Sequence, residues 1–227
     1  MKVSDIAWSH SALKVYTSCP HKYYREKVVK DVPFVENDAI KRGNDLHSTM
    51  EKAVRDDKPL PKRWDYPHLQ ELVEWARSLP AVRCEEQLAF TSELVRCEWF
   101  DRKVKVWTRA KVDLQSFFSD EVAFVLDYKT GKNWGDDGQA GLTALAMFWA
   151  NPQLQSVSTC WYYVDQDQQV TDQFHRADMI DLMEAPLKTL DQIARSYKTE
   201  RWQKTPGISC KFCGVTDCEF RGKGPNG

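Results

Sequence analysis

The chain has 227 residues, of which 42% are hydrophobic and 29% are charged, and its net charge is −1 with neutral histidines. This length and composition fit one sizeable globular domain or two small ones and argue against general disorder. We expect a cytoplasmic protein with no membrane partner, because no apolar run approaches the ~20 residues of a membrane span and the N-terminus lacks the apolar segment of a secretory signal.

Helices are predicted in the first third of the chain. A short helix begins at Ser11, and a second begins at Pro20, because proline is tolerated in a first helical turn. Residues 39–56 form a helix with one face made of Ile40, Gly43, His47, Met50 and Val54. His47 is therefore expected to point inward. The next helix has a buried stripe of Leu69, Leu72, Val73, Ala76 and Leu79.

The middle of the chain changes to the period of a β-strand. Residues 81–90 and 93–100 are short strand candidates, and apolar residues alternate with polar ones over residues 104–114. Residues 121–129 are almost continuously apolar, which is typical of the central strand of a covered sheet.

The last part of the chain returns to helices. We predict a helix over 138–150, a buried strand over 156–164 and a helix over 178–197 that Pro186 must interrupt or kink. This order predicts an α/β fold, a central mixed β-sheet flanked by helices. We expect one domain over residues 1–220 and a flexible tail over 221–227.

A carboxylate and a lysine end the central strand. Asp127 and Lys129 are two residues apart, so their side chains leave the same face of the strand roughly 7 Å apart. An exposed ion pair is the simple alternative. Two charges at the end of a buried strand, however, cost desolvation free energy, which favours a chemical role.

A second acid, Asp113, lies 14 residues before Asp127. It points to the face opposite Val112 and Leu114, or it marks a change in the facing of the strand. A turn centred near 118–119 would pair residue 113 with about residue 124, so the two acids would be diagonal neighbours that a metal ion with water ligands can bridge. Such oxygen ligands suit Mg²⁺ or Mn²⁺. Taken alone, Asp113 could equally be a turn or surface acid.

Three of the seven cysteines are close together near the C-terminus. Cys210, Cys213 and Cys218 have the spacing of a metal or cluster loop, and Cys19, before Pro20, is the candidate fourth ligand. A structural Zn²⁺ in a Cys₄ site and unliganded surface thiols are the alternatives that the spacing leaves open.

Taken together, these motifs resemble the PD-(D/E)XK nuclease superfamily, whose core is an acid followed by acid-x-lysine on a neighbouring strand. The similarity is closest to the RecB-type branch. It rests on five segments that span nearly the whole chain: YTSCPHKYY (16–24), GNDLHSTMEKA (43–53), KVDLQ (111–115), LDYKTGK (126–132) and the helix of Gln139. The resemblance implies a restriction-endonuclease-like core and a metal-dependent deoxyribonuclease.

The resemblance also implies residue roles around one catalytic metal. Asp113 and Asp127 would bind Mg²⁺ or Mn²⁺, His47 would be an additional ligand, and the carbonyl of Tyr128 a further one. Lys129 would orient or help deprotonate the attacking water.

Two more polar positions follow from the same resemblance. Glu85 would be an upstream acid, with the adjacent Glu86 as a competitor for that role. Gln139 would help to position Lys129 or the phosphate, although Thr143 stands four residues later, where family members commonly have tyrosine.

For the cysteines, the resemblance implies a 4Fe–4S cluster. In the family an N-terminal cysteine joins a C-terminal trio, so Cys19, Cys210, Cys213 and Cys218 would tie the two ends of the domain together. Zn²⁺ stays open as the alternative.

The expected function is hydrolysis of DNA phosphodiester bonds by an exonuclease that acts on ends or single strands. Because the chain has no GxxxxGK[ST] phosphate loop, it resembles free-standing nucleases, such as those of bacteriophages or of CRISPR adaptation. The alternatives are a trimming nuclease of CRISPR adaptation and a catalytically silent, metal-stapled DNA-binding accessory protein. Expected partners are DNA and a recombination or integration protein, in the cytoplasm of a bacterial or phage-infected cell.

Overall fold

The computed structural model describes residues 1–133 and 138–223, so residues 224–227 of the predicted tail lie outside the described residues. The chain divides into two compact units, one of Asn37–Leu182 and one of Met1–Glu36 with Met183–Gly227. Within the described ranges, no helix combines the length and the apolar composition needed to cross a membrane.

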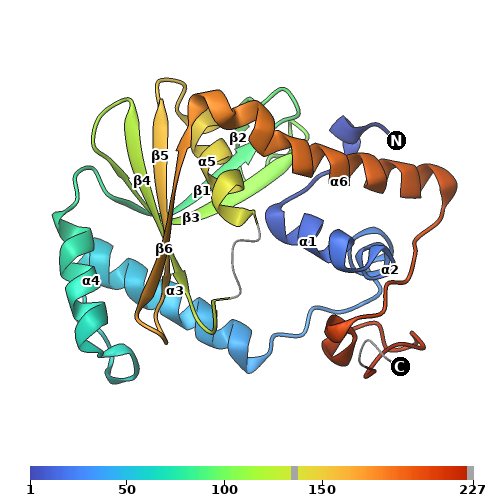
Figure 1. Ribbon diagram of the computed structural model, residues 1–227, viewed down its shortest axis with the longest axis horizontal. Helices are drawn as coiled ribbons and strands as arrows, with labels where there is room; N and C mark the ends of the chain where they lie inside the picture. The colour runs from blue at the N-terminus through green and yellow to red at the C-terminus, as the bar shows by residue number, and fades with distance from the viewer. Residues whose placement is uncertain (134–137, 224–227) are drawn as a thin grey trace. The chain divides into compact units, whose positions relative to one another are not determined.

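The larger unit contains a six-stranded mixed sheet with the strand order β2-β1-β3-β4-β5-β6 (Figure 1). Only β4 and β5 pair in parallel; the other neighbours are antiparallel. The strands are β1 (Arg83–Phe90), β2 (Arg96–Cys97), β3 (Thr108–Phe117), β4 (Val122–Lys129), β5 (Ser156–Tyr163) and β6 (Gln168–His175). The helices of this unit are α3 (Asp38–Asp56), α4 (Pro67–Ser78), α5 (Gln139–Ala150) and the first turn of α6 (Met179–Thr199). The predicted α/β fold is confirmed.

Helices cover both faces of this sheet, with α5 on one face and α3 and α4 on the other (Figure 1). Neighbouring residues of β4 point to opposite faces, so Val125 packs into the core under α5 and Leu126 packs into the core under α3 and α4. A strand covered on both sides explains why residues 121–129 are apolar almost without interruption.

The facing of β3 changes at Asp113. Val112 belongs to the core under α5, whereas Leu114, two residues later, belongs to the core under α3 and α4. In a regular strand these two residues would share a face. On the neighbouring strand Glu85 has a φ of 59°, a left-handed conformation that is unusual for a residue with a side chain. The strand also begins at Thr108, not at residue 104 as predicted.

The hairpin between β3 and β4 has a different register from the predicted one. Leu114 pairs with Leu126, and the backbone N–H groups of Phe118 and Ser119 both donate to the carbonyl of Val122. The turn is therefore centred on residue 120, more than one residue later than predicted. Continued by one residue, this register sets residue 113 opposite residue 127, not opposite 124.

Two further elements differ from the prediction. Strand β6 was not expected, because its segment QQVTDQFH is mostly polar; it pairs with β5 at the edge of the sheet, where most of its side chains are exposed. Helix α6 continues through Pro186, so the predicted interruption is wrong, and the alternative of a kink stays a prediction. Leu190 and Ile193 are buried, and their packing stabilises the turns that follow Pro186. This packing compensates for the backbone hydrogen bond that proline cannot donate.

The buried face of α3 lies one residue away from the predicted stripe. Its buried residues are Leu46, Thr49, Met50 and Ala53. His47 lies at the edge of this stripe, and 28% of its side chain is exposed. The imidazole is thus placed between the core and solvent, where it can meet a ligand.

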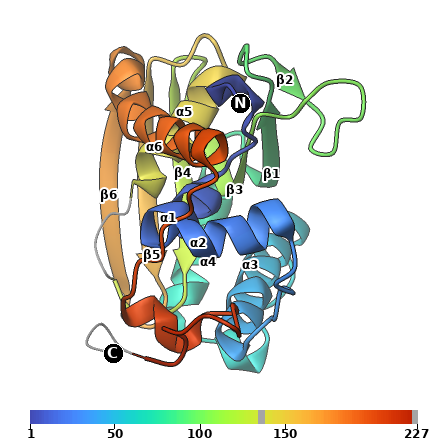
Figure 2. The same cartoon turned by 90° about the vertical axis from the view of Figure 1, so that its right-hand side faces the viewer.

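The smaller unit contains α1 (His10–Ser18), α2 (Pro20–Tyr23), a π-helical turn (Tyr24–Val29), most of α6 and a 3₁₀-helix (Ile208–Phe212), as Figure 2 shows. The helices predicted at Ser11 and Pro20 are confirmed to within a residue. The hydroxyl groups of Tyr16 and Ser196 are 2.8 Å apart, and Trp202 stacks on Tyr24 with ring centroids separated by 5.1 Å. These contacts join segments that are distant in sequence.

Candidate active site

Asp113 lies where strands β3 and β4 separate. The ladder between them ends at the Leu114–Leu126 pair, and Asp113 Oδ2 then accepts a hydrogen bond from the backbone N–H of Tyr128 at 3.0 Å. The Asp113 residue is 7% exposed. The Asp113 carboxylate therefore accepts a hydrogen bond from a β4 N–H group just beyond the last β3–β4 pair. This bond fixes the carboxylate between the two separating strands.

His47 contacts the same carboxylate from helix α3. Its Nδ1 lies 2.9 Å from Asp113 Oδ2. Burial disfavours the charged imidazole, but the hydrogen bond and the negative charge of Asp113 outweigh burial and raise the pKa of His47. The helix and the sheet thus deliver an imidazole and an acid to one point.

Glu85 completes this group from strand β1. One ligand atom each from His47, Glu85 and Asp113 lie within 4.8 Å of one another, the only such trio of possible metal ligands in the part of the chain that the structure describes. Glu85 also forms an ion pair with Lys111. Glu86 instead pairs with Arg96 at 3.2 Å, so the geometry favours Glu85 over its neighbour.

An open groove of about 420 Å³ leads to this trio. It is lined by residues of α3, β1 and β3: Asn44, His47, Ser48, Glu51, Glu85, Lys111 and Asp113. The groove gives solvent access to the three possible ligands.

Asp127, Lys129 and Gln139 form a second polar cluster, next to the first. Lys129 Nζ lies 2.7 Å from Asp127 Oδ2 and donates a hydrogen bond to Gln139 Oε1 at 2.9 Å. Gln139 Nε2 donates in turn to Asp127 Oδ1 at 3.4 Å. Burial and the charge of Asp113 raise the pKa of Asp127 to about 6, although Lys129 acts in the opposite direction. The three side chains hold one another in place.

These residues fit a divalent cation. Asp127 Oδ2 is buried, and the Lys129 ammonium 2.7 Å away balances its charge. Besides burial, the charge of Asp113 raises the pKa of Asp127, so the two carboxylates lie near each other, and a divalent cation bound between them would relieve this repulsion. Carboxylate oxygens are suitable ligands for Mg²⁺ and Mn²⁺, and the imidazole nitrogen shifts the preference of the site toward Mn²⁺.

The predicted role of the Tyr128 carbonyl stays a prediction. At this position the structure gives the N–H of Tyr128 a partner, Asp113. The phenol of Tyr128 is buried, and its ring lies edge-on to the His47 imidazole at 6.4 Å. The Tyr128 ring therefore packs against the His47 imidazole.

The sequence did not reveal a clamp beside the site. Arg42 Nη1 lies 2.7 Å from Asp165 Oδ2, and the same oxygen accepts the backbone N–H of Gly131 at 2.8 Å. Gly131 has a φ of 92°. The clamp ties α3, which carries His47, to the segment that follows Lys129. No local motif marks it, because Arg42 and Asp165 are 123 residues apart.

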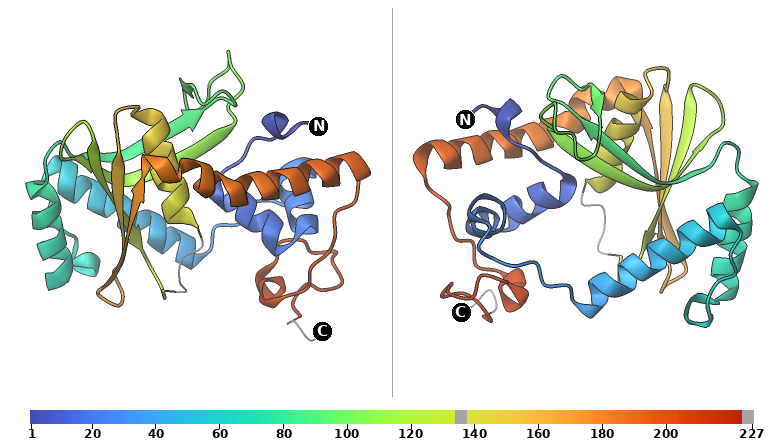
Figure 3. Two further views of the ribbon diagram at one scale, coloured as in Figure 1. Left: turned by 45° about the horizontal axis from the view of Figure 1, so that its top comes forward. Right: turned by 180° about the vertical axis from the view of Figure 1, so that it is seen from behind.

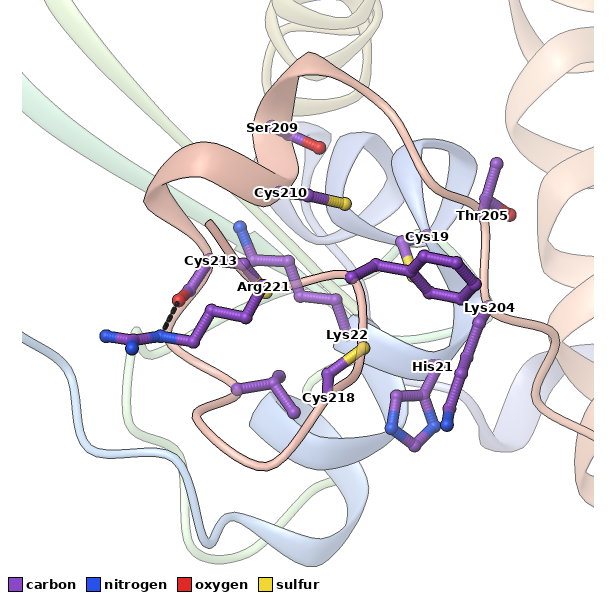
Figure 4. A pocket seen from close by; sticks show the side chains of 12 residues that line it. Cys19, His21, Lys22, Lys204, Thr205, Ser209, Cys210, Cys213, Cys218 and Arg221 are labelled. Carbon is purple, nitrogen blue, oxygen red and sulfur yellow. Dashed lines mark hydrogen bonds between the residues drawn. The ribbon is translucent and has the colours of Figure 1, made fainter. Parts of the chain in front are cut away.

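The four predicted cysteine ligands line one cavity of the smaller unit (Figure 4). No three of their sulfur atoms lie within 4.8 Å of one another, since the only trio of that kind in the described ranges is the one around His47. Four thiolates at ~2.3 Å from one tetrahedral Zn²⁺ would be only about 3.8 Å apart. The cysteines Cys19, Cys210, Cys213 and Cys218 are therefore spread more widely than a formed zinc site.

The family profile and one solved structure agree with the fold. The sequence profile of the PD-(D/E)XK nuclease superfamily matches residues 7–218. A solved protein of Eubacterium rectale named “Putative exonuclease” is 11% identical, with a TM-score of 0.53 over 93% of this chain and 86% of that one. An alkaline exonuclease of Laribacter hongkongensis is 12% identical, with a TM-score of 0.43 over 86% of this chain and 91% of that one. No protein with a curated functional description matches the sequence.

Proposed function

The chain belongs to the PD-(D/E)XK nuclease superfamily, and on this basis we propose that it is a metal-dependent deoxyribonuclease that acts as an exonuclease on DNA ends or single strands. The observation that carries the proposal is the convergence of His47, Glu85 and Asp113 from three different elements. The pair of Asp127 and Lys129 stands on the strand next to Asp113. Acids, an imidazole and an amine are the groups that metal-assisted hydrolysis requires.

In this proposal His47, Asp113 and Asp127 hold Mg²⁺ or Mn²⁺, with Glu85 as a further acid. When bound, the ion supplies Lewis-acid chemistry: it offsets charge on the phosphate and makes water a better nucleophile. Besides burial, the charge of Asp113 raises the pKa of Asp127, so the two carboxylates lie near each other, which supports the role of Asp127 as a ligand of the same ion.

Lys129 acts on the attacking water and on the phosphate. Its ammonium group is held by Asp127 and Gln139, so it needs little reorganisation when substrate arrives. The positive charge stabilises the negative charge that develops on the phosphate oxygens, and the amine orients the water for in-line attack. Gln139 is a positioning residue in this scheme.

The choice of an exonuclease rests on the RecB-type resemblance and agrees with the name of the Eubacterium rectale protein. The intact set of His47, Asp113, Asp127 and Lys129 argues against a catalytically silent accessory protein. Local basic residues and a metal can hold a phosphate backbone without a basic protein overall, which fits the net charge of −1.

A degradation assay with end-labelled linear DNA and closed circular DNA tests the proposal. In Mn²⁺ or Mg²⁺ the wild type should degrade linear DNA and spare the circle, and EDTA should stop the reaction. Asp127→Ala and Lys129→Ala should abolish cleavage and leave DNA binding in place. If the wild type and both variants behave alike, the chain is not this enzyme.

We also propose that Cys19, Cys210, Cys213 and Cys218 bind a 4Fe–4S cluster. The proposal rests on the RecB-type resemblance and is supported by the common cavity that the four cysteines line. Anaerobic purification should then give a brown protein whose visible absorption is lost in Cys213→Ser. A colourless protein with one equivalent of zinc would favour the alternative.

A further inference from the structure

Residues 98–105, which make up most of the segment between β2 and β3, project away from the sheet (Figures 2 and 3). We call these residues the wedge loop. Within it Phe100 is 80% exposed, and Val104 is 44% exposed. Because Phe34 and Phe212 are at least as exposed, exposure alone does not single out Phe100, and the case for a partner depends on how the loop holds the ring and on the charge around it.

The wedge loop is folded around one carboxylate. Asp101 Oδ1 accepts the backbone N–H groups of Lys103 at 2.7 Å and Val104 at 3.1 Å, and its Oδ2 accepts the N–H of Glu98 at 3.4 Å. These bonds use the acid to close the turn. The loop therefore presents its tip in a defined conformation.

Arg109 fixes the aromatic side of the loop. Its Nε donates to the carbonyl of Trp99 at 2.7 Å, and its guanidinium lies 5.7 Å from the ring centroid of Trp99 and 5.8 Å from that of Phe100. The cation contacts both rings and holds them in place. Because the Phe100 side chain is already restricted, it loses little conformational entropy when a partner stacks on its free face.

The charge around Phe100 indicates a polyanion. Residues 96–109 contain five basic and two acidic side chains, a local charge of +3 in a chain of net charge −1. One of the two acids, Asp101, is turned toward backbone N–H groups. Arg102 and Lys103 are exposed on the loop beside Phe100. Phe100 lies edge-on to Trp99, with ring centroids 6.5 Å apart, and two basic side chains follow it in the loop. An aromatic ring beside basic side chains suits a nucleic acid, whose bases can stack on the ring and whose phosphates can bind the cations.

We propose that the wedge loop engages the junction between single- and double-stranded DNA, with Phe100 stacked on the base at the junction and Arg102 and Lys103 on the neighbouring phosphates. This inference rests on the proposed function, because it takes DNA as the substrate. Strand β3 begins at Thr108, close behind the loop, and Asp113 follows five residues later, roughly 17 Å along the strand. That distance corresponds to about five base pairs.

The test is DNA binding without cleavage. Wild type and Phe100→Ala are titrated in EDTA against a forked duplex with 2-aminopurine at the junction, and anisotropy and base fluorescence are recorded. Base–aromatic stacking predicts a roughly 5- to 150-fold loss of affinity in Phe100→Ala and a changed 2-aminopurine signal. Phe100→Trp should retain both. The matched control is Phe118→Ala, which removes another exposed phenylalanine, 54% exposed, at the β3–β4 turn.

The outcomes separate this inference from the proposed function. If the wild type binds the forked DNA and Phe100→Ala binds it equally well with the same fluorescence, Phe100 does not stack on the junction base. The exposed ring would then be assigned to a protein contact, and the nuclease proposal would be unaffected. If the wild type binds no DNA, both proposals fail. Thermal melting of Phe100→Ala should match the wild type, because an exposed ring contributes little to folding.

The basic residues have a separate signature. In Arg102→Ala/Lys103→Ala the slope of log affinity against log salt should fall by about 2, because two phosphate contacts are lost. An unchanged slope would remove these residues from the interface.

Discussion

Asp113 Oδ2 accepts the backbone N–H of Tyr128 at 3.0 Å, across the point where β3 and β4 separate. The same oxygen lies 2.9 Å from His47 Nδ1. One carboxylate oxygen therefore both caps the opened ladder and orients the imidazole, so the architecture of the sheet and the geometry of the site depend on the same atom.

Asp113 should show separable effects on stability and activity. Asp113→Asn keeps an oxygen that accepts the Tyr128 N–H but removes the charge, so metal binding and cleavage should be lost with little change in folding. Asp113→Ala leaves the buried N–H without that partner and should lower the free energy of unfolding by about 1–3 kcal/mol. Urea denaturation in EDTA, with Mn²⁺ titration by calorimetry, measures both. Equal stability of Asp113→Ala and wild type would contradict the capping role.

Metal affinity should fall as the pH is lowered through about 6. The pKa of Asp127 is raised to about 6 by burial and by the charge of Asp113, and the pKa of His47 is also raised. Both groups therefore bind protons at a higher pH than they would in an unfolded chain, and these protons compete with the metal. Mn²⁺ affinity measured by EPR should drop between pH 7.5 and 5.5. A constant affinity over this range would contradict the assignment of these ligands.

Glu85 and Glu86 provide a matched pair of substitutions. Glu85 belongs to the trio with His47 and Asp113, whereas Glu86 pairs with Arg96. Glu85→Gln should reduce cleavage roughly 10- to 100-fold, the usual effect of weakening a metal site. Glu86→Gln should cleave like the wild type. Steady-state assays at several Mn²⁺ concentrations compare the two, and the opposite ranking would transfer the role to Glu86.

The Arg42–Asp165 clamp should affect turnover more than stability. Arg42→Ala removes the pair that ties α3 to the segment after Lys129, and a small displacement of that segment should lower kcat about 10-fold. The change in unfolding free energy should stay below about 1 kcal/mol, since the pair is partly exposed. Arg195→Ala, which breaks an exposed pair with Asp191 on α6, is the control. A KM effect with unchanged kcat would indicate a role in binding instead.

The α/β class and most of the elements could be predicted from the sequence, because the periods of 2 and 3.6 residues are local properties. Residues 121–129 and 138–150 were predicted within a residue of their observed bounds. Strand β6 was missed because a polar edge strand carries no apolar alternation. The types of side chain at the site were also readable, since Asp127 and Lys129 share a strand end.

Which side chains meet at the site could not be predicted and follows from long-range pairing. The turn centred on residue 120 brings residue 113 opposite residue 127. On β1, the backbone at Glu85 is left-handed, and Glu85, not Glu86, lies beside His47. The Arg42–Asp165 contact likewise spans 123 residues. Register and facing depend on turn length and on packing from both sides of the sheet, and a shift of one residue reverses a side chain's direction. Local periodicity specifies an element, but only long-range pairing specifies which of its side chains converge.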